Sequence, residues 1–256
     1  METLRISVEQ KNQNIYSEIL QAKKANQKLL AILLDPDKVD LQNIKSLISK
    51  IKESPATHIF IGGSLVLENS IDQIILELKK EIILPIVLFP GNPSQISSEA
   101  DGILFLSLLS GRNPDFLIEH QVKAAPILKK SDLEIISTGY ILIESGNQTA
   151  VTSVSKTIPL PRHNSQIAVD TALAGEFLGS KLIYLEAGSG AKLSVPLETI
   201  SLVSKTISIP LIVGGGITDF DAIKEAFFAG ADLVVIGTAF ENNPNFFTNF
   251  NLPPND

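Results

Sequence analysis

Eight short apolar runs, spread over most of the chain, are the feature that most constrains how this sequence folds. They are rich in Ile, Val and Leu, and several end in Gly, Asp or Ser: LLAILLD (29–35), HIFIGGS (58–64), PIVLFPG (85–91), GILFLSL (102–108), EIISTGYILI (134–143), LIYLEAG (182–188), LIVGGG (211–216) and LVVIGT (233–238). A strand that is apolar on both faces is typical of a parallel sheet covered by helices, whereas an open antiparallel sheet shows alternation. The runs therefore predict eight buried parallel strands.

Segments with helical periodicity separate most of these runs. Apolar residues recur at intervals of three and four in 41–53, 70–82, 113–130, 168–179 and 219–230, and Pro196 marks the first turn of another helix. This alternation predicts an α/β protein with a TIM (β/α)8 barrel, since a doubly wound open sheet usually supplies fewer strands. The barrel should be modified. The segment after Gly91 predicts an incomplete third helix, residues 144–165 resemble a loop, and the first 28 residues predict an N-terminal helical extension.

The composition excludes several classes of protein. The chain of 256 residues has 21 Lys and Arg against 28 Asp and Glu, a net charge of −7, which argues against a nucleic-acid partner. It has no Cys, so disulfides, thiolate metal sites and a cysteine nucleophile are excluded. The apolar runs fall short of the roughly 20 residues that a membrane-spanning helix needs, and the N-terminus lacks a secretory signal. We therefore expect a single domain over residues 1–256, located in the cytoplasm.

Three glycine-rich segments close the last three predicted strands: EAGSGA (186–191), VGGGI (213–217) and IGT (236–238). Glycine lets backbone N–H groups approach an anion closely, and helix N-termini favour negative charge. The loops after strands seven and eight are also the usual phosphate site of a barrel. The alternative is that these glycines only permit tight turns. Their placement at successive strand ends favours a site for a phosphate monoester.

Tyr184 and Glu186 share one face of their predicted strand, because side chains alternate along it. Ile183 and Leu185 suit the helix layer, so Tyr184 and Glu186 are expected to point into the barrel mouth. A carboxylate there can accept a proton from a hydroxyl group or bind it by a strong hydrogen bond. The alternative is a Glu satisfied by a buried lysine or by backbone donors. The adjacent phosphate loops favour a catalytic or substrate-binding role.

Asp35 and Ser64 end the first two predicted strands and should therefore be neighbours. A carboxylate and a hydroxyl suit Mg²⁺ that is completed by water and substrate phosphates. Each residue alone is more often structural, with Asp35 bonding its own turn and Ser64 capping a helix. Asp37 remains an alternative ligand. The histidines at 58, 120 and 163 show no metal-binding spacing and are interpreted as surface or packing residues.

The stretch LFPGN (88–92) places an apolar, proline-stiffened corner at the end of the third predicted strand. Little helix follows it, so the barrel wall should contain a slot whose apolar lining suits a hydrocarbon tail. Core packing or a subunit contact explains the same residues, and composition alone favours that interpretation.

In their order along the chain, seven motifs together resemble geranylgeranylglyceryl phosphate synthase: DPDK (35–38), GGS (62–64), FPGN (89–92), TGYILIESG (138–146), YLEAGSGA (184–191), VGGGI (213–217) and IGTAFE (236–241). The resemblance covers nearly the whole chain. YLEAGSG is its most specific part, whereas GGGI occurs in many phosphate-binding barrels. Leu33 stands where a shorter, heptaprenylglyceryl phosphate branch has lysine, so the chain resembles the longer branch. The prenyl-length preference of the shorter branch is therefore not transferred.

This resemblance implies a Mg²⁺-dependent prenyltransferase of ether-lipid biosynthesis. It would join sn-glycerol 1-phosphate to geranylgeranyl diphosphate through an ether bond and release diphosphate. Asp35 and Ser64 would hold the metal, while Glu186 would bind the glycerol hydroxyl and assist its deprotonation, with Tyr184 beside it. The residues around glycerol phosphate would be Tyr184, Leu185, Glu186, Ala187, Gly188, Ser189, Gly190, Gly215, Gly216, Gly237 and Thr238.

The resemblance also implies a homo-oligomer. Some relatives use a Trp in their subunit contacts and this chain has none, so dimer and hexamer both stay open. A lipid product suggests peripheral contact with a membrane. Residues 144–165 would form a lid that shields the allylic cation from water.

Two other functions fit a phosphate-binding barrel. A phosphosugar isomerase or aldolase would need an acid/base pair or a Schiff-base lysine at a strand end, and neither stands out in the sequence. The other is a non-catalytic barrel that binds a phosphate ligand.

Overall fold

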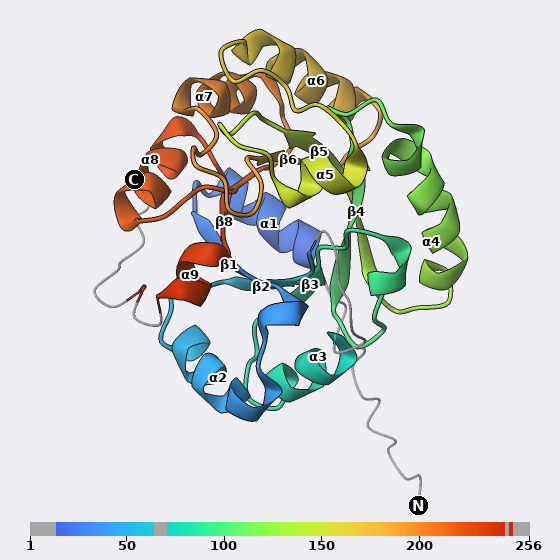
Figure 1. The fold of residues 1–256 in the computed structure, drawn as a ribbon, viewed down its shortest axis with the longest axis vertical. Helices are drawn as coiled ribbons and strands as arrows, with labels where there is room; N and C mark the ends of the chain where they lie inside the picture. Colours follow the sequence, from blue (N-terminus) through green and yellow to red (C-terminus); the bar gives the residue numbers. More distant parts are fainter. Residues whose placement is uncertain (1–13, 64–70, 244–245, 248–256) are drawn as a thin grey trace, which may run out of the picture.

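The structure, a computed structural model, describes residues 14–63, 71–243 and 246–247. Eight parallel strands follow one another around a closed barrel, and β1 pairs with both β2 and β8 (Figure 1). Their bounds are β1 Leu29–Leu34, β2 His58–Ile61, β3 Ile86–Leu88, β4 Gly102–Leu108, β5 Glu134–Leu142, β6 Leu182–Glu186, β7 Leu211–Gly214 and β8 Leu233–Ile236. The predicted strands and the TIM-barrel fold are confirmed.

Helices surround the barrel, as the periodicity predicts (Figure 1). The outer ones are α2 Ile44–Lys52, α3 Ile71–Lys79, α4 His120–Leu128, α6 Ser165–Phe177, α7 Leu197–Thr206 and α8 Phe220–Ala229. Shorter elements are the 3-10 turns η1 Pro36–Lys38 and η2 Leu41–Asn43, the π-helical turn η4 Asp115–Glu119 and the final helix α9 Thr238–Asn242. Among the described residues, no helix combines the length and hydrophobicity needed to cross a membrane.

Alternation along each strand divides the core into two layers. Ile183 and Leu185 of β6 belong to the outer cluster, together with Ile200 and Val203 of α7. Tyr184 belongs to the inner cluster, which fills the barrel. Strands apolar on both faces are thus explained by the burial of both faces, one against helices and one inside the barrel.

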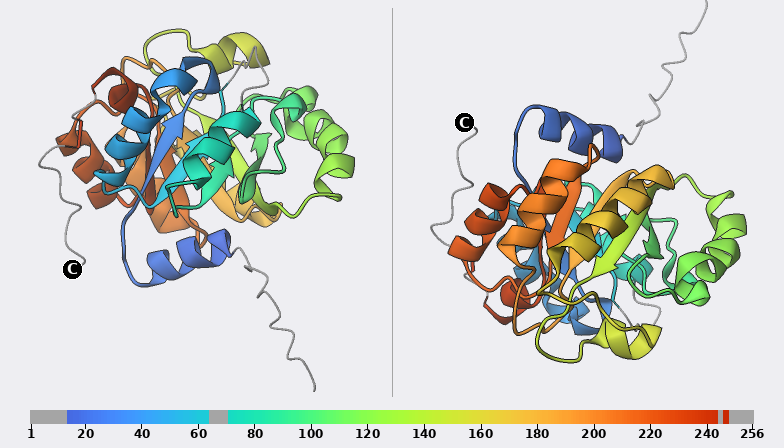
Figure 2. Two further views of the ribbon diagram at one scale, coloured as in Figure 1. Left: turned by 90° about the horizontal axis from the view of Figure 1, so that it is seen from below. Right: turned by 90° about the horizontal axis from the view of Figure 1, so that it is seen from above.

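Helix α1 (Ile15–Lys24) closes the amino-terminal end of the barrel. Its Ile15, Ile19 and Ala22 pack into the inner cluster. The Glu134 carboxylate, at the start of β5, accepts hydrogen bonds from the backbone N–H groups of Ile15 at 2.6 Å and Tyr16 at 3.0 Å. Figure 2 shows α1 on the side of the barrel opposite α5 and α9. The predicted N-terminal helical extension is confirmed.

The wall is thin between β3 and β4. Only the 3-10 turn η3 (Pro93–Gln95) connects these strands, and their pairing covers two residue pairs, Val87 with Gly102 and Leu88 with Ile103. The predicted incomplete third helix is confirmed.

Residues 144–165 are not entirely a loop. They contain helix α5 (Ala150–Ser155), at whose start the Thr149 N–H donates to Thr152 Oγ1 at 3.0 Å. The segment resembles a loop in sequence because this helix has six residues, most of them small or polar. Whether it acts as a lid stays a prediction.

Candidate functional site

A cavity of about 500 Å³ lies at the carboxyl ends of the strands. Asp35, from the end of β1, and Glu186, from the end of β6, both line it. The predicted metal position and the predicted proton acceptor therefore open onto the same side of the barrel. From the glycine-rich segments come Gly188, Ser189, Gly190, Gly215, Gly216, Gly237 and Thr238.

Glu186 is a buried carboxyl group at the base of this cavity. Its side chain lines the cavity although only 5% of the residue is exposed. Burial raises the pKa of Glu186 to about 7, while the nearby Tyr184 hydroxyl and the Gly188 N–H lower it. That N–H donates to Glu186 Oε1 at 2.6 Å. The group can therefore exchange a proton near neutral pH, which suits a general base.

The Tyr184 hydroxyl lies beside Glu186 and has no hydrogen-bond partner of acceptable geometry among the described residues. Burial, and then the charge of Glu186, raise the pKa of Tyr184 well above its ordinary value, so the hydroxyl keeps its proton. A buried hydroxyl rarely lacks a partner, and one that borders a cavity is suited to hydrogen-bond a ligand. Tyr184 thus offers a donor to the molecule that fills the cavity.

Gly215 allows the loop after β7 to approach Glu186. Its φ is +80°, and a Cβ atom there would lie 2.3 Å from Glu186 Oε1 and 2.5 Å from the Gly188 nitrogen. A side chain at Gly215 would therefore displace both the carboxylate and the loop that binds it.

The three glycine-rich loops surround one part of the cavity. Ser189 Oγ and Thr238 Oγ1 are 3.5 Å apart, which brings the loops after β6 and β8 together. Gly237 and Thr238, at the start of α9, both line the cavity. We call the loop residues 188–190, 215–216 and 237–238 the phosphate cup.

Leu185 and Ala187 are the two members of the set predicted around glycerol phosphate whose side chains point away from the cavity. Their side chains belong to the outer cluster and do not line the cavity. The reason is the alternation that directs Tyr184 and Glu186 inward.

The Asp35 side of the cavity carries a charged cluster. One carboxylate oxygen of Asp35 accepts from the Asp37 N–H at 3.2 Å, so the structural role considered above is present. The other lies 3.6 Å from Lys38 Nζ, and Lys38 also pairs with Glu241 of α9 at 2.9 Å. Lys38 and Glu241 line the cavity and were not identified from the sequence.

Ser64, the other predicted metal ligand, lies outside the described residues. Asp37 is exposed and is not among the cavity lining. Within the described ranges no three His, Cys, Asp or Glu residues form a metal-binding group. Of the residues predicted as metal ligands, Asp35 is the one in the described part of the chain that lines the cavity.

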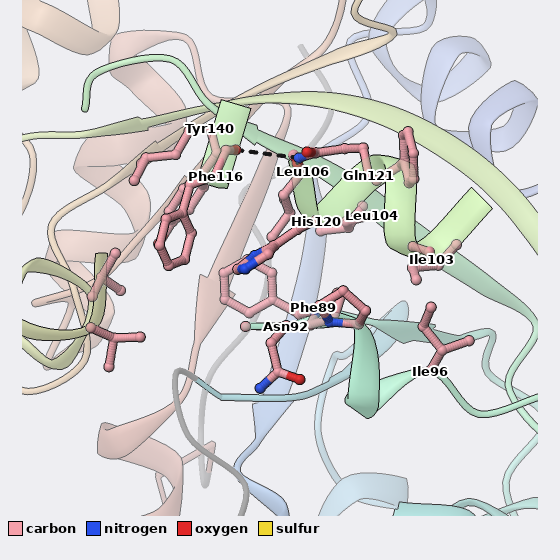
Figure 3. A pocket seen from close by; sticks show the side chains of 18 of the residues that line it. Phe89, Asn92, Ile96, Ile103, Leu104, Leu106, Phe116, His120, Gln121 and Tyr140 are labelled. Carbon is pink, nitrogen blue, oxygen red and sulfur yellow. Dashed lines mark hydrogen bonds between the residues drawn. The ribbon is translucent and has the colours of Figure 1, made fainter. Parts of the chain in front are cut away.

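An apolar pocket adjoins the main cavity at the thin part of the wall. Figure 3 shows its lining, which includes Phe89, Ile96, Phe116 and His120. Gly63, Phe89 and Tyr140 line both spaces. The rings of Phe89 and Tyr184 stack with centroids 5.3 Å apart, so aromatic side chains form the partition between pocket and cavity. The slot predicted from 88–92 is present.

The histidines occupy different environments. His58 is buried, which lowers its pKa to about 4, and is a packing residue as predicted. His120 instead lines the apolar pocket, its ring 4.6 Å from that of Phe116. Gln121, beside it, is buried with its Oε1 unpartnered among the described residues. Because both lie within a helical pattern, the sequence indicated only a surface or packing role for His120 and did not identify Gln121.

Comparison with known proteins gives consistent similarities. The model of the PcrB family matches residues 22–250. The geranylgeranylglyceryl phosphate synthase of Flavobacterium johnsoniae is 67% identical over 233 residues, covering 91% of this chain and 96% of the relative. That of Korarchaeum cryptofilum is 43% identical, covering 86% of this chain and 90% of the relative.

A solved structure is also similar, the (S)-3-O-geranylgeranylglyceryl phosphate synthase of Thermoplasma acidophilum in complex with its substrate sn-glycerol-1-phosphate. It is 32% identical, with a TM-score of 0.86, and the match covers 91% of this chain and 94% of that chain.

Proposed function

The chain belongs to the PcrB family, and from this premise we propose that it is a prenyltransferase joining sn-glycerol 1-phosphate to geranylgeranyl diphosphate through an ether bond. Diphosphate is released, and the product is an ether-lipid precursor. One observation carries the proposal. A phosphate cup, a carboxylate with a pKa of about 7 and Asp35 share a single cavity, which joins an apolar pocket.

The phosphate cup would bind the phosphate of sn-glycerol 1-phosphate. Its glycines let backbone N–H groups approach an anion closely. The substrate named for the Thermoplasma acidophilum structure agrees with this assignment. The glycerol hydroxyl would then lie at Glu186, which accepts its proton, while Tyr184 donates a hydrogen bond to the bound substrate.

The apolar pocket would take the prenyl tail. Its volume is about 100 Å³. An engineered apolar cavity of about 150 Å³ binds one benzene. A long tail must therefore extend beyond the pocket as it stands. The carbon that reacts would lie at the partition of Phe89, Tyr140 and Tyr184, where pocket and cavity meet. These aromatic rings would limit the access of water to it.

The residues present fit a Mg²⁺ ion held mainly by its substrate. Asp35 offers a hard carboxylate oxygen on the cavity wall, and Mg²⁺ is commonly bound by one or two carboxylates together with water and substrate phosphates. Asp35 would hold the ion, with Ser64 as the second ligand that the resemblance implies and Asp37 as an alternative. Bound there, Mg²⁺ would neutralise charge on the diphosphate.

We also propose that the protein is a homo-oligomer. Phe177 and Leu178 at the end of α6 and Phe228 of α8 are large apolar side chains about four-fifths exposed, and a second copy would cover such residues. Sedimentation analysis of the purified protein tests this proposal, and a monomer at micromolar concentration would refute it.

Product analysis tests the function directly. Purified protein with Mg²⁺, sn-glycerol 1-phosphate and geranylgeranyl diphosphate should yield prenylglyceryl phosphate, identified by mass spectrometry. Complete removal of the metal and Asp35→Asn should each reduce turnover strongly. Binding of glycerol phosphate without any product would favour the non-catalytic alternative. A phosphosugar aldolase is less well supported, because the only lysine in the described lining, Lys38, is paired with carboxylates.

A further inference from the structure

Lys38 holds the only positive charge in the described lining of the main cavity. Three carboxylates, those of Asp35, Glu186 and Glu241, line the same space. Two substrates that each carry several negative charges would have to bind here. The groups that pair with Lys38 therefore affect how the cavity binds these two anionic substrates.

The pairing of Lys38 is one that an anionic substrate can replace. Its Nζ lies 2.9 Å from Glu241 and 3.6 Å from Asp35, and its side chain is 49% exposed. Ion pairs this exposed contribute little net stability, whereas a charge-assisted hydrogen bond to a phosphate oxygen is strong. Lys38 can exchange a carboxylate for a phosphate with little loss of protein stability.

Position favours one substrate over the other. The glycerol phosphate has the phosphate cup, whose backbone N–H groups bind an anion without a side-chain cation. Lys38 instead lies next to Asp35, the residue assigned to the metal and its diphosphate. An anion bound at Asp35 through a metal ion would therefore have Lys38 as its neighbour.

We propose that Lys38 binds the diphosphate of the prenyl donor, leaving Glu241 and Asp35 to do so, and stabilises that diphosphate as it departs. The proposal rests on the proposed function. In the reaction the bond between the allylic carbon and the diphosphate oxygen breaks, and its electron pair stays on the diphosphate. The glycerol oxygen bonds to that carbon, and its proton passes to Glu186. Lys38 keeps its proton throughout and acts through charge.

Two consequences follow for the neighbouring carboxylates. When Lys38 turns to the diphosphate, the Asp35 carboxylate loses its cationic partner and is left to a metal ion. Glu241 acts as a positioning residue, because its hydrogen bond holds the lysine at the cavity wall before the donor arrives.

The test is a calorimetric titration with inorganic pyrophosphate, in excess Mg²⁺ and with saturating sn-glycerol 1-phosphate to fill the phosphate cup. Lys38→Met should weaken pyrophosphate binding about tenfold or more, as expected for loss of a charged hydrogen bond. Lys38→Arg, which keeps the charge, should stay within about threefold of the wild type. In steady-state assays Lys38→Met should raise the KM for the prenyl diphosphate and leave the KM for sn-glycerol 1-phosphate unchanged.

Lys52→Met is the matched control. Lys52, the last residue of α2, forms a similar exposed ion pair with Glu81 at 2.7 Å, and neither residue lines the cavity. It should change neither measurement. If Lys38→Met does not fold, Lys38→Gln carries the same expectation. Unchanged pyrophosphate affinity, or a KM effect confined to sn-glycerol 1-phosphate, would overturn the proposal. A wild-type protein that makes no prenylglyceryl phosphate would refute the proposed function instead, and the titration would still decide whether Lys38 binds a diphosphate.

Discussion

Glu186 shows how burial sets the chemistry of one side chain. Removal from water raises its pKa to about 7, so the free protein holds a mixture of both forms at neutral pH. A general base works only when it is deprotonated. We therefore expect kcat/KM to fall as the pH drops below about 7 and to level off above it. A pH–rate profile measures this, and a flat profile from pH 5 to 9 would exclude Glu186 as the base.

The same pKa shift predicts an effect on stability. The folded pKa of about 7 exceeds the ordinary value of 4.5, so the contribution of Glu186 to stability is complete below pH 4.5 and is lost as the pH rises to about 7. Glu186→Gln removes the charge and should increase the free energy of unfolding at pH 8 by at most about 3 kcal/mol. At pH 4 the two proteins should be equally stable. Urea unfolding at both pH values checks this, and activity should be lost at each.

A substitution of Tyr184 should weaken substrate binding without lowering the stability of the protein. Its hydroxyl is buried without a partner among the described residues, so Tyr184→Phe removes an unsatisfied polar group and should leave stability unchanged or slightly higher. Loss of the hydrogen bond to substrate should raise the KM for sn-glycerol 1-phosphate about tenfold. Thermal unfolding and steady-state kinetics together test this. A clear loss of stability with an unchanged KM would mean that the hydroxyl has a structural partner instead.

At the scale of elements, α1 depends on a carboxylate from a distant strand. Glu134 accepts from the N–H groups of Ile15 and Tyr16, which the first turn of a helix cannot satisfy itself. Glu134→Ala should therefore cost about 1–2 kcal/mol of stability, as the loss of a helix cap does. The kcat should not change, because α1 lies at the opposite end of the barrel from the cavity. Glu134→Gln keeps an acceptor and should lose less stability than Glu134→Ala. Equal stability of the wild type and both variants in urea unfolding would contradict this role of Glu134.

The strands could be predicted because most of their residues are apolar, and burial on two faces demands that composition. Helix α5 could not, since six residues carry too little periodicity and a local hydrogen bond between Thr149 and Thr152 starts it. The candidate site likewise contains some residues that the sequence predicts and others that it does not. Tyr184, Glu186 and the glycine-rich loops follow from alternation and from the position of strand ends. The Lys38–Glu241 pair joins residues 203 apart in the sequence and depends on barrel closure, which brings β1 beside β8.

Across the whole molecule, the two halves of the site are built from different parts of the barrel. The phosphate cup comes from the loops after β6, β7 and β8, whereas the apolar pocket lies at the β3–β4 wall and α4. Ala124 of α4 lines that pocket and is buried. Ala124→Phe should raise the KM for long prenyl diphosphates and shift products toward shorter chains, at a stability cost of about 1–3 kcal/mol from overpacking.

This substitution should leave the affinity for sn-glycerol 1-phosphate unchanged, which calorimetry measures. Val122→Phe is the matched control, because Val122 is on the same helix but is exposed and does not line the pocket. Its products should match those of the wild type. A parallel loss of both affinities in Ala124→Phe would mean that pocket and cup are one coupled site.

The packing of α1 against one end of the barrel determines where substrates can enter and products can leave. Because α1 closes the amino-terminal end of the barrel, both substrates must enter, and both products must leave, at the opposite end. A newly formed lipid whose tail still occupies the apolar pocket prevents the next prenyl diphosphate from binding. We therefore expect the release of this lipid, in addition to bond formation, to limit the rate of turnover.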